Sequence, residues 1–306
     1  MIKVFKMTEE KSKWVKYGAI FAIIIMIGSA VLVGLSLYGN DSTDPVEYPL
    51  KSIKGTQADF TFKNAKDGVK YLPAGILSVE VIKIYPGDVI AESFNNAFPG
   101  VTSDKVMVGS YPDGIVEYYA VDENNNGSVI VPGKPRYDEY NGYNVLIMSP
   151  AQRVIAGDPL IVASFFNYTL NNTLGKRVAD VLAGKSSGAT DLNDILAYAE
   201  DTDVFDEIRA FKANNGSDYD KYYQCTSQSE TGILKIEAIF LSPNEDVKES
   251  VSAFANNASD SVTVAVLEDG PALKIYITTS DYIGFLVEMQ NLNQLISSHT
   301  AQGSSA

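Results

Sequence analysis

Residues 75–86 read GILSVEVIKIYP and residues 232–243 read GILKIEAIFLSP, so that six of twelve positions are identical. The likeness continues from DVIAESFNNAF (88–98) to EDVKESVSAFA (245–255). It continues again from DKVMVGSYPDGIVEYYAV (104–121) to DSVTVAVLEDGPALKIYI (260–277). The matched stretches keep their order and spacing. This predicts that residues 75–121, the first unit, and residues 232–277, the second unit, arose by duplication.

Each unit reads as β-α-β-β. An apolar stretch predicts a strand, the following apolar residues recur at helical spacing, and alternating valines predict a second strand. Asp113-Gly114 and Asp269-Gly270 then supply the residues of a tight hairpin turn. In the second unit, the sequence Ser-Pro-Asn-Glu at residues 242–245 predicts a capping box with proline at the first helical position. We therefore expect the two units to superpose.

The rest of the chain completes an α+β architecture. We expect a C-terminal helix over residues 280–298, and residues 122–231 to form a mainly helical insert between two antiparallel sheets. Within the insert, residues 144–148 look like a strand. Helices are expected over residues 158–183, 190–200 and 203–213. Residues 39–74 read as a juxtamembrane linker and residues 299–306 as a disordered tail.

The linker follows a segment that predicts a membrane anchor. Residues 17–38, YGAIFAIIIMIGSAVLVGLSLY, contain no charge in 22 positions, which is long enough for a helix to span the hydrocarbon core. Residues 1–16 hold five lysines and two glutamates. This basic segment predicts a cytoplasmic N-terminus and an exterior C-terminal domain. A cleaved signal peptide and a pilin-type segment cut after Gly18 are alternatives.

Charge and cysteine content narrow the class of protein. The net charge of −14 leaves −17 beyond residue 16, an acidity that disfavours nucleic-acid partners. Cys225 is the single cysteine, so no intramolecular disulfide can form. This fits a prokaryotic surface, with an archaeal one as the preferred setting. Six sequons agree with an exterior address: Asn40, Asn126, Asn167, Asn171, Asn215 and Asn257.

Catalytic groups are scarce in the sequence. The only histidine, His299, falls in the expected tail, so a Ser-His-Asp mechanism has no base, and we expect no catalytic residues. Asp122, Asn124 and Asn126, followed by Gly127, match the opening of a calcium loop. Gly133 stands where the bidentate glutamate would be, and a plain turn is the simpler interpretation. No other cofactor is expected.

Tyrosines offer the main candidate for recognition. Tyr137, Tyr140 and Tyr143 form a rigid amphipathic cluster, placed by hypothesis at the face between the two units. We therefore expect a non-catalytic binding, scaffold or accessory protein, anchored in the lipid bilayer and partnered by another surface or membrane protein. A carboxylate-dependent surface hydrolase and a pilin-like or surface-layer component are the alternatives. Packing of these tyrosines at a sheet edge is the simpler explanation of the cluster.

Overall fold

The computed structural model describes residues 45–49, 62–121, 127–132, 136–140, 143–147, 152–154, 160–164, 173–200 and 203–300. Within them, one nine-stranded sheet forms the framework, and every neighbouring pair of strands is antiparallel. Its strands, in spatial order, are β13 (Thr263–Asp269), β14 (Ala272–Thr279), β12 (Leu234–Leu241), β11 (Lys221–Gln228), β10 (Glu207–Lys212), β2 (Ser78–Lys83), β3 (Ser103–Tyr111), β4 (Gly114–Val121) and β9 (Leu160–Ser164). The α+β class predicted from the sequence is confirmed.

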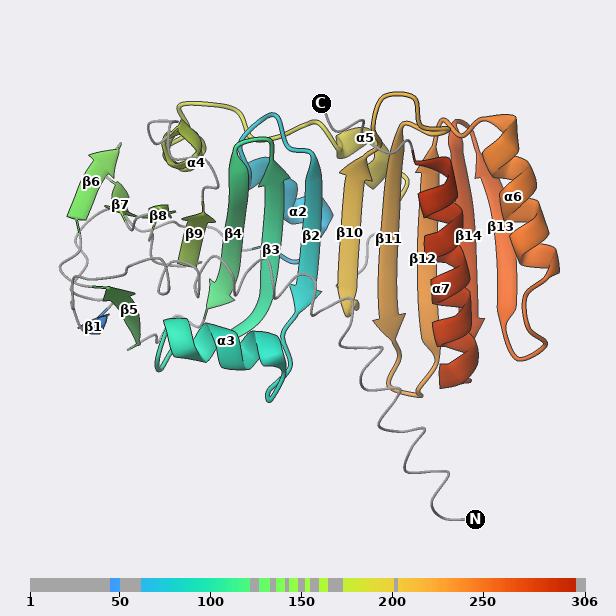
Figure 1. Ribbon diagram of the computed structural model, residues 1–306, viewed down its shortest axis with the longest axis horizontal. Coiled ribbons are helices and arrows are strands. Elements are labelled where there is room, and N and C mark those ends of the chain that lie inside the picture. Colours follow the sequence, from blue (N-terminus) through green and yellow to red (C-terminus); the bar gives the residue numbers. More distant parts are fainter. Residues whose placement is uncertain are drawn as a thin grey trace, which may run out of the picture.

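Two small sheets accompany the large one. The first pairs β1 (Pro45–Pro49) with β5 (Ser128–Pro132). The second joins β6 (Arg136–Tyr140), β7 (Tyr143–Ile147) and β8 (Gln152–Val154), and β8 contacts the edge strand β9. Figure 1 shows both small sheets beyond β9, at the end of the molecule opposite β13.

Helices cover the two faces of the large sheet. The helices are α2 (Ala65–Gly68), the 3-10 turn η2 (Val69–Tyr71), α3 (Val89–Ala97), α4 (Thr173–Leu182), α5 (Asn193–Leu196), α6 (Glu245–Asn256) and α7 (Tyr282–His299). Figure 1 shows α3, α6 and α7 in front of the sheet, and α2 and α5 behind it. We call these two sides the α7 face and the α5 face.

A separate hydrophobic core lies on each face, because alternate residues of a strand point to opposite sides. Strand β11 shows the alternation: Tyr222 belongs to the core under α6 and α7, whereas Tyr223 and Cys225 belong to the core under α2 and α5. On the α7 face, the other half of the sheet is covered by α3, whose Phe94 stacks on Tyr119 with ring centroids 4.5 Å apart.

The predicted superposition of the two units is wrong, although both have the element order β-α-β-β. The strands of the first unit lie in the order β2-β3-β4, whereas those of the second lie in the order β12-β14-β13. The matched residues also face opposite ways. Val79 and Val81 point to the α5 face, and their counterparts Ile236 and Ala238 point to the α7 face. Successive residues of a strand point to opposite faces of the sheet, so an offset of one residue exchanges the two faces. Similar sequences therefore need not place matched residues on the same face.

The described residues of the insert are not mainly helical. Residues 207–212, expected within a helix, form β10, and residues 160–164, also expected to be helical, form β9. In EIRAFK the buried Ile208 and Ala210 alternate with half-buried neighbours, which is a strand pattern. Pairing with β2 and β11 on both sides completes β10 as a central strand. The strand expected at residues 144–148 is confirmed as β7. Among the described residues, the helix expected at 190–200 is reduced to α5, and the one expected at 158–183 includes α4.

Local signals at element ends were partly correct. The N-cap of α6 is Asn244, whose side chain accepts a hydrogen bond from the Val247 N–H at 3.1 Å, so the predicted cap at Ser242 is wrong. Two-residue hairpins follow β3 and β13, as predicted. No helix among the described residues is long and apolar enough to cross a membrane. Residues 17–38, which carry the anchor prediction, lie outside the described residues.

Candidate functional site

A hydrogen-bonded chain of Asp218, His299 and Ser250 is the most chemically specific cluster in the described structure. His299 Nδ1 lies 2.8 Å from Asp218 Oδ2, and His299 Nε2 lies 2.9 Å from Ser250 Oγ. The imidazole side chain is 12 % exposed. Asp218 is held from its other oxygen by the Asn244 side-chain amide at 2.8 Å. The hydrogen bond with His299 is the main cause that lowers the pKa of Asp218.

Three elements place these groups together. Ser250 lies in the middle of α6, His299 is the last residue of α7, and Asp218 lies in the loop that joins β10 to β11. The Asp218 N–H donates to the backbone oxygen of His299 at 3.0 Å, so the loop also satisfies a carbonyl at the end of the helix. The prediction that His299 belongs to a disordered tail is therefore wrong. Residues 301–306 of that tail lie outside the described residues.

The order of atoms in this chain is that of a Ser-His-Asp hydrolase, in which histidine takes the serine proton and the aspartate orients the ring. One requirement is harder to meet. An oxyanion needs free N–H donors, and Ser250 is the sixth residue of α6, beyond the first turn where helix N–H groups are unpaired. These three hydrogen-bonded side chains can transfer a proton. They also join α7 to α6 and to the loop that contains Asp218.

A second cluster surrounds Glu237 on the α5 face. Glu237 is 6 % exposed, and both of its carboxylate oxygens accept from the Glu200 N–H at 3.2 Å. Burial raises the pKa of Glu237 to about 7, and the charge of Glu200 also raises it. The Glu200 N–H and the Lys274 charge act in the opposite direction. Lys274 pairs with Asp269 at 2.9 Å.

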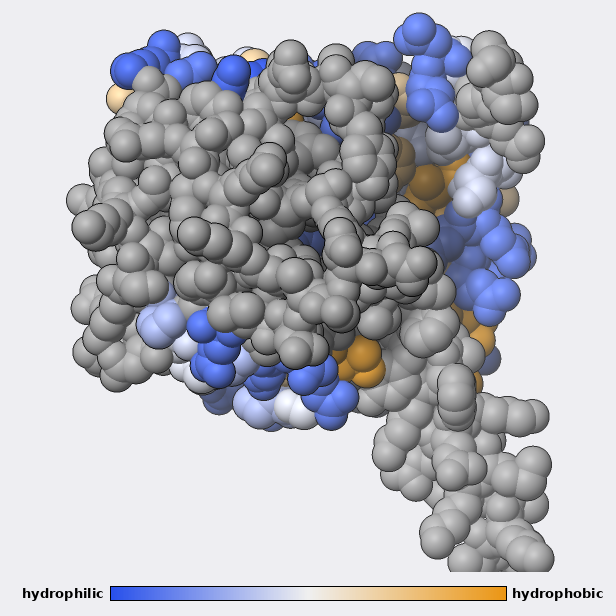
Figure 2. Space-filling view, turned by 60° about the vertical axis from the view of Figure 1, so that its left-hand side comes forward, coloured by the Kyte–Doolittle hydropathy of each residue, from blue (hydrophilic) through white to orange (hydrophobic). Residues whose placement is uncertain are grey.

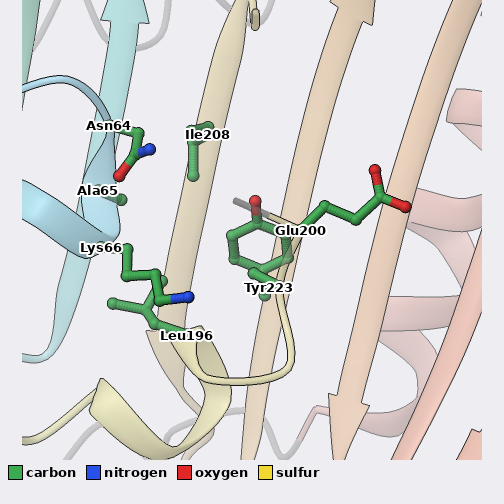
Figure 3. A pocket seen from close by; sticks show the side chains of 8 residues that line it. Asn64, Ala65, Lys66, Leu196, Glu200, Ile208 and Tyr223 are labelled. Atoms are coloured by element: carbon green, nitrogen blue, oxygen red, sulfur yellow. The ribbon is translucent and has the colours of Figure 1, made fainter. Parts of the chain in front are cut away.

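A small hollow lies beside this cluster, lined by Asn64, Ala65, Lys66, Leu196, Ala199, Glu200, Ile208 and Tyr223. Figure 3 shows the Glu200 carboxylate pointing away from the other labelled side chains. The volume that a water-sized sphere can occupy is about 10 Å³, roughly enough for one water molecule. This hollow is far below the ~300 Å³ of a typical ligand pocket, so it does not mark a small-molecule site.

A third cluster crosses the α7 face between α3 and α7. The strand pairing sets Glu117, Glu80, Arg209 and Gln224 in one row, with Val108 between the first two. Burial and the neighbouring Glu207 together raise the pKa of Glu80 to about 8, against the lowering effect of the Arg209 charge.

Arg209 is held in this row by two amide oxygens rather than by a carboxylate. Its Nη2 donates to Gln224 Oε1 and to Asn293 Oδ1, each at 2.7 Å. Its Nε is buried and has no hydrogen-bond partner within the described part of the chain. The row is thus a polar seam on the α7 face, and Glu80 in it holds its proton to a higher pH than an exposed glutamate does.

The edge strand β13 is the most exposed strand of the sheet whose side chains are described. It pairs with β14 on one side, and no described strand pairs with its outer edge. Leu267 is 53 % exposed and Val266 is 38 % exposed. The sequence TVAVLED contains no lysine and no proline, the residues that commonly block pairing at an edge. The described residues visible in Figure 2 include both hydrophilic surface and apolar patches.

The predicted tyrosine site is not at the junction of the two units. Tyr137 and Tyr140 lie on β6, and Tyr143, which begins β7, pairs with Tyr140 across the hairpin. Their three-stranded sheet lies beyond β9, whereas β10 and β11 separate the two units. The hypothesis of a site between the units is therefore wrong, and recognition by the tyrosines themselves stays a prediction.

Other predicted sites fall largely outside the described residues. Asp122, Asn124 and Asn126 lie there, so the calcium prediction stays a prediction, and no metal-binding group occurs among the residues that were placed. Of the six sequons, Asn215 and Asn257 are described, and both are exposed. Asn40, Asn126, Asn167 and Asn171 lie in the undescribed stretches.

Comparison of the chain with protein-family models, with curated proteins and with solved structures finds no match.

Proposed function

We propose that this chain is a membrane-anchored extracytoplasmic binding protein of an archaeal cell surface, and that it binds its partner by adding a strand to β13. The partner is another surface or membrane protein, in keeping with the expected anchor at residues 17–38. Strand addition uses main-chain hydrogen bonds for affinity and alternate side chains for specificity.

The observation that carries this proposal is the outer edge of β13, with which no described strand pairs. An edge with exposed Val266 and Leu267 is a template for another strand. A binding role also needs no substrate pocket, and the hollow beside Glu200 is too small for one.

Photo-crosslinking in native membranes tests this function. A photoreactive amino acid at Glu268, on the exposed edge, should give protein adducts that the same group at Ile283 does not. Ile283 is 65 % exposed on α7 and is the matched control for accessibility. Equal or absent adducts at the two positions would show that β13 is not a binding edge.

Hydrolysis is a second candidate function, favoured by the Asp218–His299–Ser250 chain. A fluorophosphonate reacts with a serine whose proton is taken by a histidine, and should label Ser250 in the wild type but not in His299→Gln. If Ser250 is not labelled in the folded protein, hydrolysis is rejected, and the hydrogen bonds of Asp218, His299 and Ser250 have a structural role only. The paired carboxylates expected of a carboxylate-dependent hydrolase have a counterpart in Glu80 and Glu207 on the α7 face.

A further inference from the structure

We infer that one end of the large sheet rests on the outer face of the lipid bilayer and inserts exposed apolar side chains into it. At this end β2 and β14 finish and β10 and β12 begin, and Figure 1 shows it as the lower end. The inference rests on the anchor of the proposed function, residues 17–38, and is independent of what pairs with β13.

Exposed apolar side chains gather at the lower end. Ten large apolar side chains of the described residues are exposed, and six of them lie at this end: Tyr85, Val89, Val204, Ile233, Tyr282 and Ile283. The strand pairing brings their segments together. The Lys83 N–H, at the end of β2, donates to the backbone oxygen of Asp206, just before β10, at 2.9 Å, and Leu234 of β12 pairs with Thr279 of β14. Apolar side chains gathered in this way mark an interaction surface.

Helix α7 shows how deep this surface is. Ile283 and Val287 are exposed on one side of its first two turns, and Asn291, Gln294 and Ser298 continue that side to the other end of the helix. The apolar part therefore spans about 6 Å along the axis, within the ~5–10 Å to which apolar groups sink at a bilayer surface. A change from apolar to polar with distance from the lower end is the pattern of a boundary between lipid and water.

The chain enters the domain at the same end. Strand β1 begins at Pro45 and pairs with β5, whose Ser128 N–H donates to the Pro99 carbonyl, after α3, at 2.9 Å. Figure 1 shows β1 level with α3, which lies across the lower end. The predicted anchor ends at residue 38, so six residues separate it from β1. Six residues extend at most about 20 Å, which keeps the lower end close to the bilayer.

Attraction between charges does not supply this contact, because carboxylates also border the lower end of an acidic domain. Asp88 accepts from the Tyr85 N–H at 3.0 Å, and Asp206 accepts from the Tyr85 hydroxyl. Asp281 accepts from the Ile283 N–H at 3.0 Å as the N-cap of α7. These carboxylates are engaged by the protein, and tyrosine is a residue typical of membrane interfaces. The contact should therefore form on neutral lipid and should not need anionic lipid.

Fluorescence quenching by lipid tests the contact in the full chain, reconstituted as one copy per nanodisc of neutral phosphatidylcholine. Cys225, the only cysteine, is first replaced by alanine. A fluorophore on Ile283→Cys, or on Val204→Cys from a separate segment, should be quenched at least twofold by lipids that carry a nitroxide near the headgroup. The same fluorophore on Leu77→Cys should not be quenched. Leu77 is also exposed, but it precedes β2 at the opposite end of the sheet, and is the matched control.

Several outcomes would overturn the inference. Quenching at Ile283 no stronger than at Leu77 is one, and quenching that requires anionic lipid is another. A chain that inserts into the discs, lacks quenching at Ile283 and gives protein adducts at Glu268 in membranes would lose this inference and keep the proposed function. A chain that does not insert would contradict the anchor, and with it both proposals.

Substitutions on α7 check that apolar side chains supply the contact. Ile283→Gln combined with Val287→Gln should reduce the quenching at Val204 at least twofold. The melting temperature should stay nearly unchanged, because both side chains are exposed. Gln294→Ala, on the polar part of the same side, is the control and should leave the quenching unchanged. Quenching at Val204 that survives the two glutamines would overturn the insertion of α7.

Discussion

At the scale of single residues, the described structure holds several acidic groups inside polar seams rather than at the surface. Glu80 is the clearest case, because burial and the charge of Glu207 raise its pKa to about 8, from an ordinary value of 4.5. The folded chain therefore keeps this proton at pH values where the unfolded chain has lost it. The resulting stability is fully present below about pH 4.5 and is lost as pH rises through about 8.

Replacing Glu80 with glutamine should remove this loss. We expect Glu80→Gln to match the wild type near pH 5 and to melt higher at pH 8.5, by roughly 1 kcal/mol or about 2–4 °C after screening by solvent. Thermal melts at the two pH values measure the difference, and Glu249→Gln on the exposed surface of α6 is the control. A gap that does not widen with pH would mean that Glu80 is ionised in the folded protein.

At the scale of elements, the residue pattern within a segment predicted its secondary structure, but it did not predict which strands pair with each other. The strand β2, the helix α3 and the hairpins after β3 and β13 follow from apolar spacing and turn residues, and the structure contains all four. The strand order does not follow, because two similar β-α-β-β stretches place their hairpin strands in reversed order. The helix predicted over residues 203–213 is wrong for a related reason. The neighbouring strands β2 and β11 supply the pairing partners that make residues 207–212 the strand β10.

The candidate site depended on the same kind of long-range contact. Asp218 and His299 are 81 positions apart, and Ser250 lies 49 positions before His299, so no motif joins them. The helical pattern of residues 280–298 was the available signal, because one further residue puts His299 in α7. The polar residues from Ser297 onward predict a tail, and that prediction wrongly places the only histidine outside the folded domain.

The contribution of the hydrogen bond between Ser250 and His299 to stability can be measured by substitutions on α6. Ser250→Ala and Ser252→Ala both gain the helix propensity of alanine, but Ser250 also bonds to His299. The Ser252 hydroxyl bonds within the helix, to the Lys248 carbonyl at 2.9 Å. We expect Ser250→Ala to be less stable than Ser252→Ala by about 1 kcal/mol in chemical denaturation. Equal stabilities would mean that the hydrogen bond to His299 adds nothing.

At the scale of the whole molecule, the orientation across the membrane decides whether β13 can meet a partner outside the cell. The lysines before residue 17 and the uncharged run to residue 38 predict an exterior domain, and the exposed Asn215 and Asn257 are accessible for glycosylation there. Protease added to intact cells should therefore degrade the domain while a cytoplasmic marker survives. The fragment left in the membrane should contain residues 1–38.

A protected domain in cells whose wall admits the protease would reverse the orientation. An N-terminus beginning after residue 18 or residue 36 would instead reveal cleavage, and the anchor would then be a pilin-type segment or a signal peptide. Anchoring and release have different consequences for β13. An anchored exterior domain stays beside other proteins of the same membrane, which raises the local concentration at which β13 meets a partner. A released domain lacks this local concentration and would need a stronger contact with its partner.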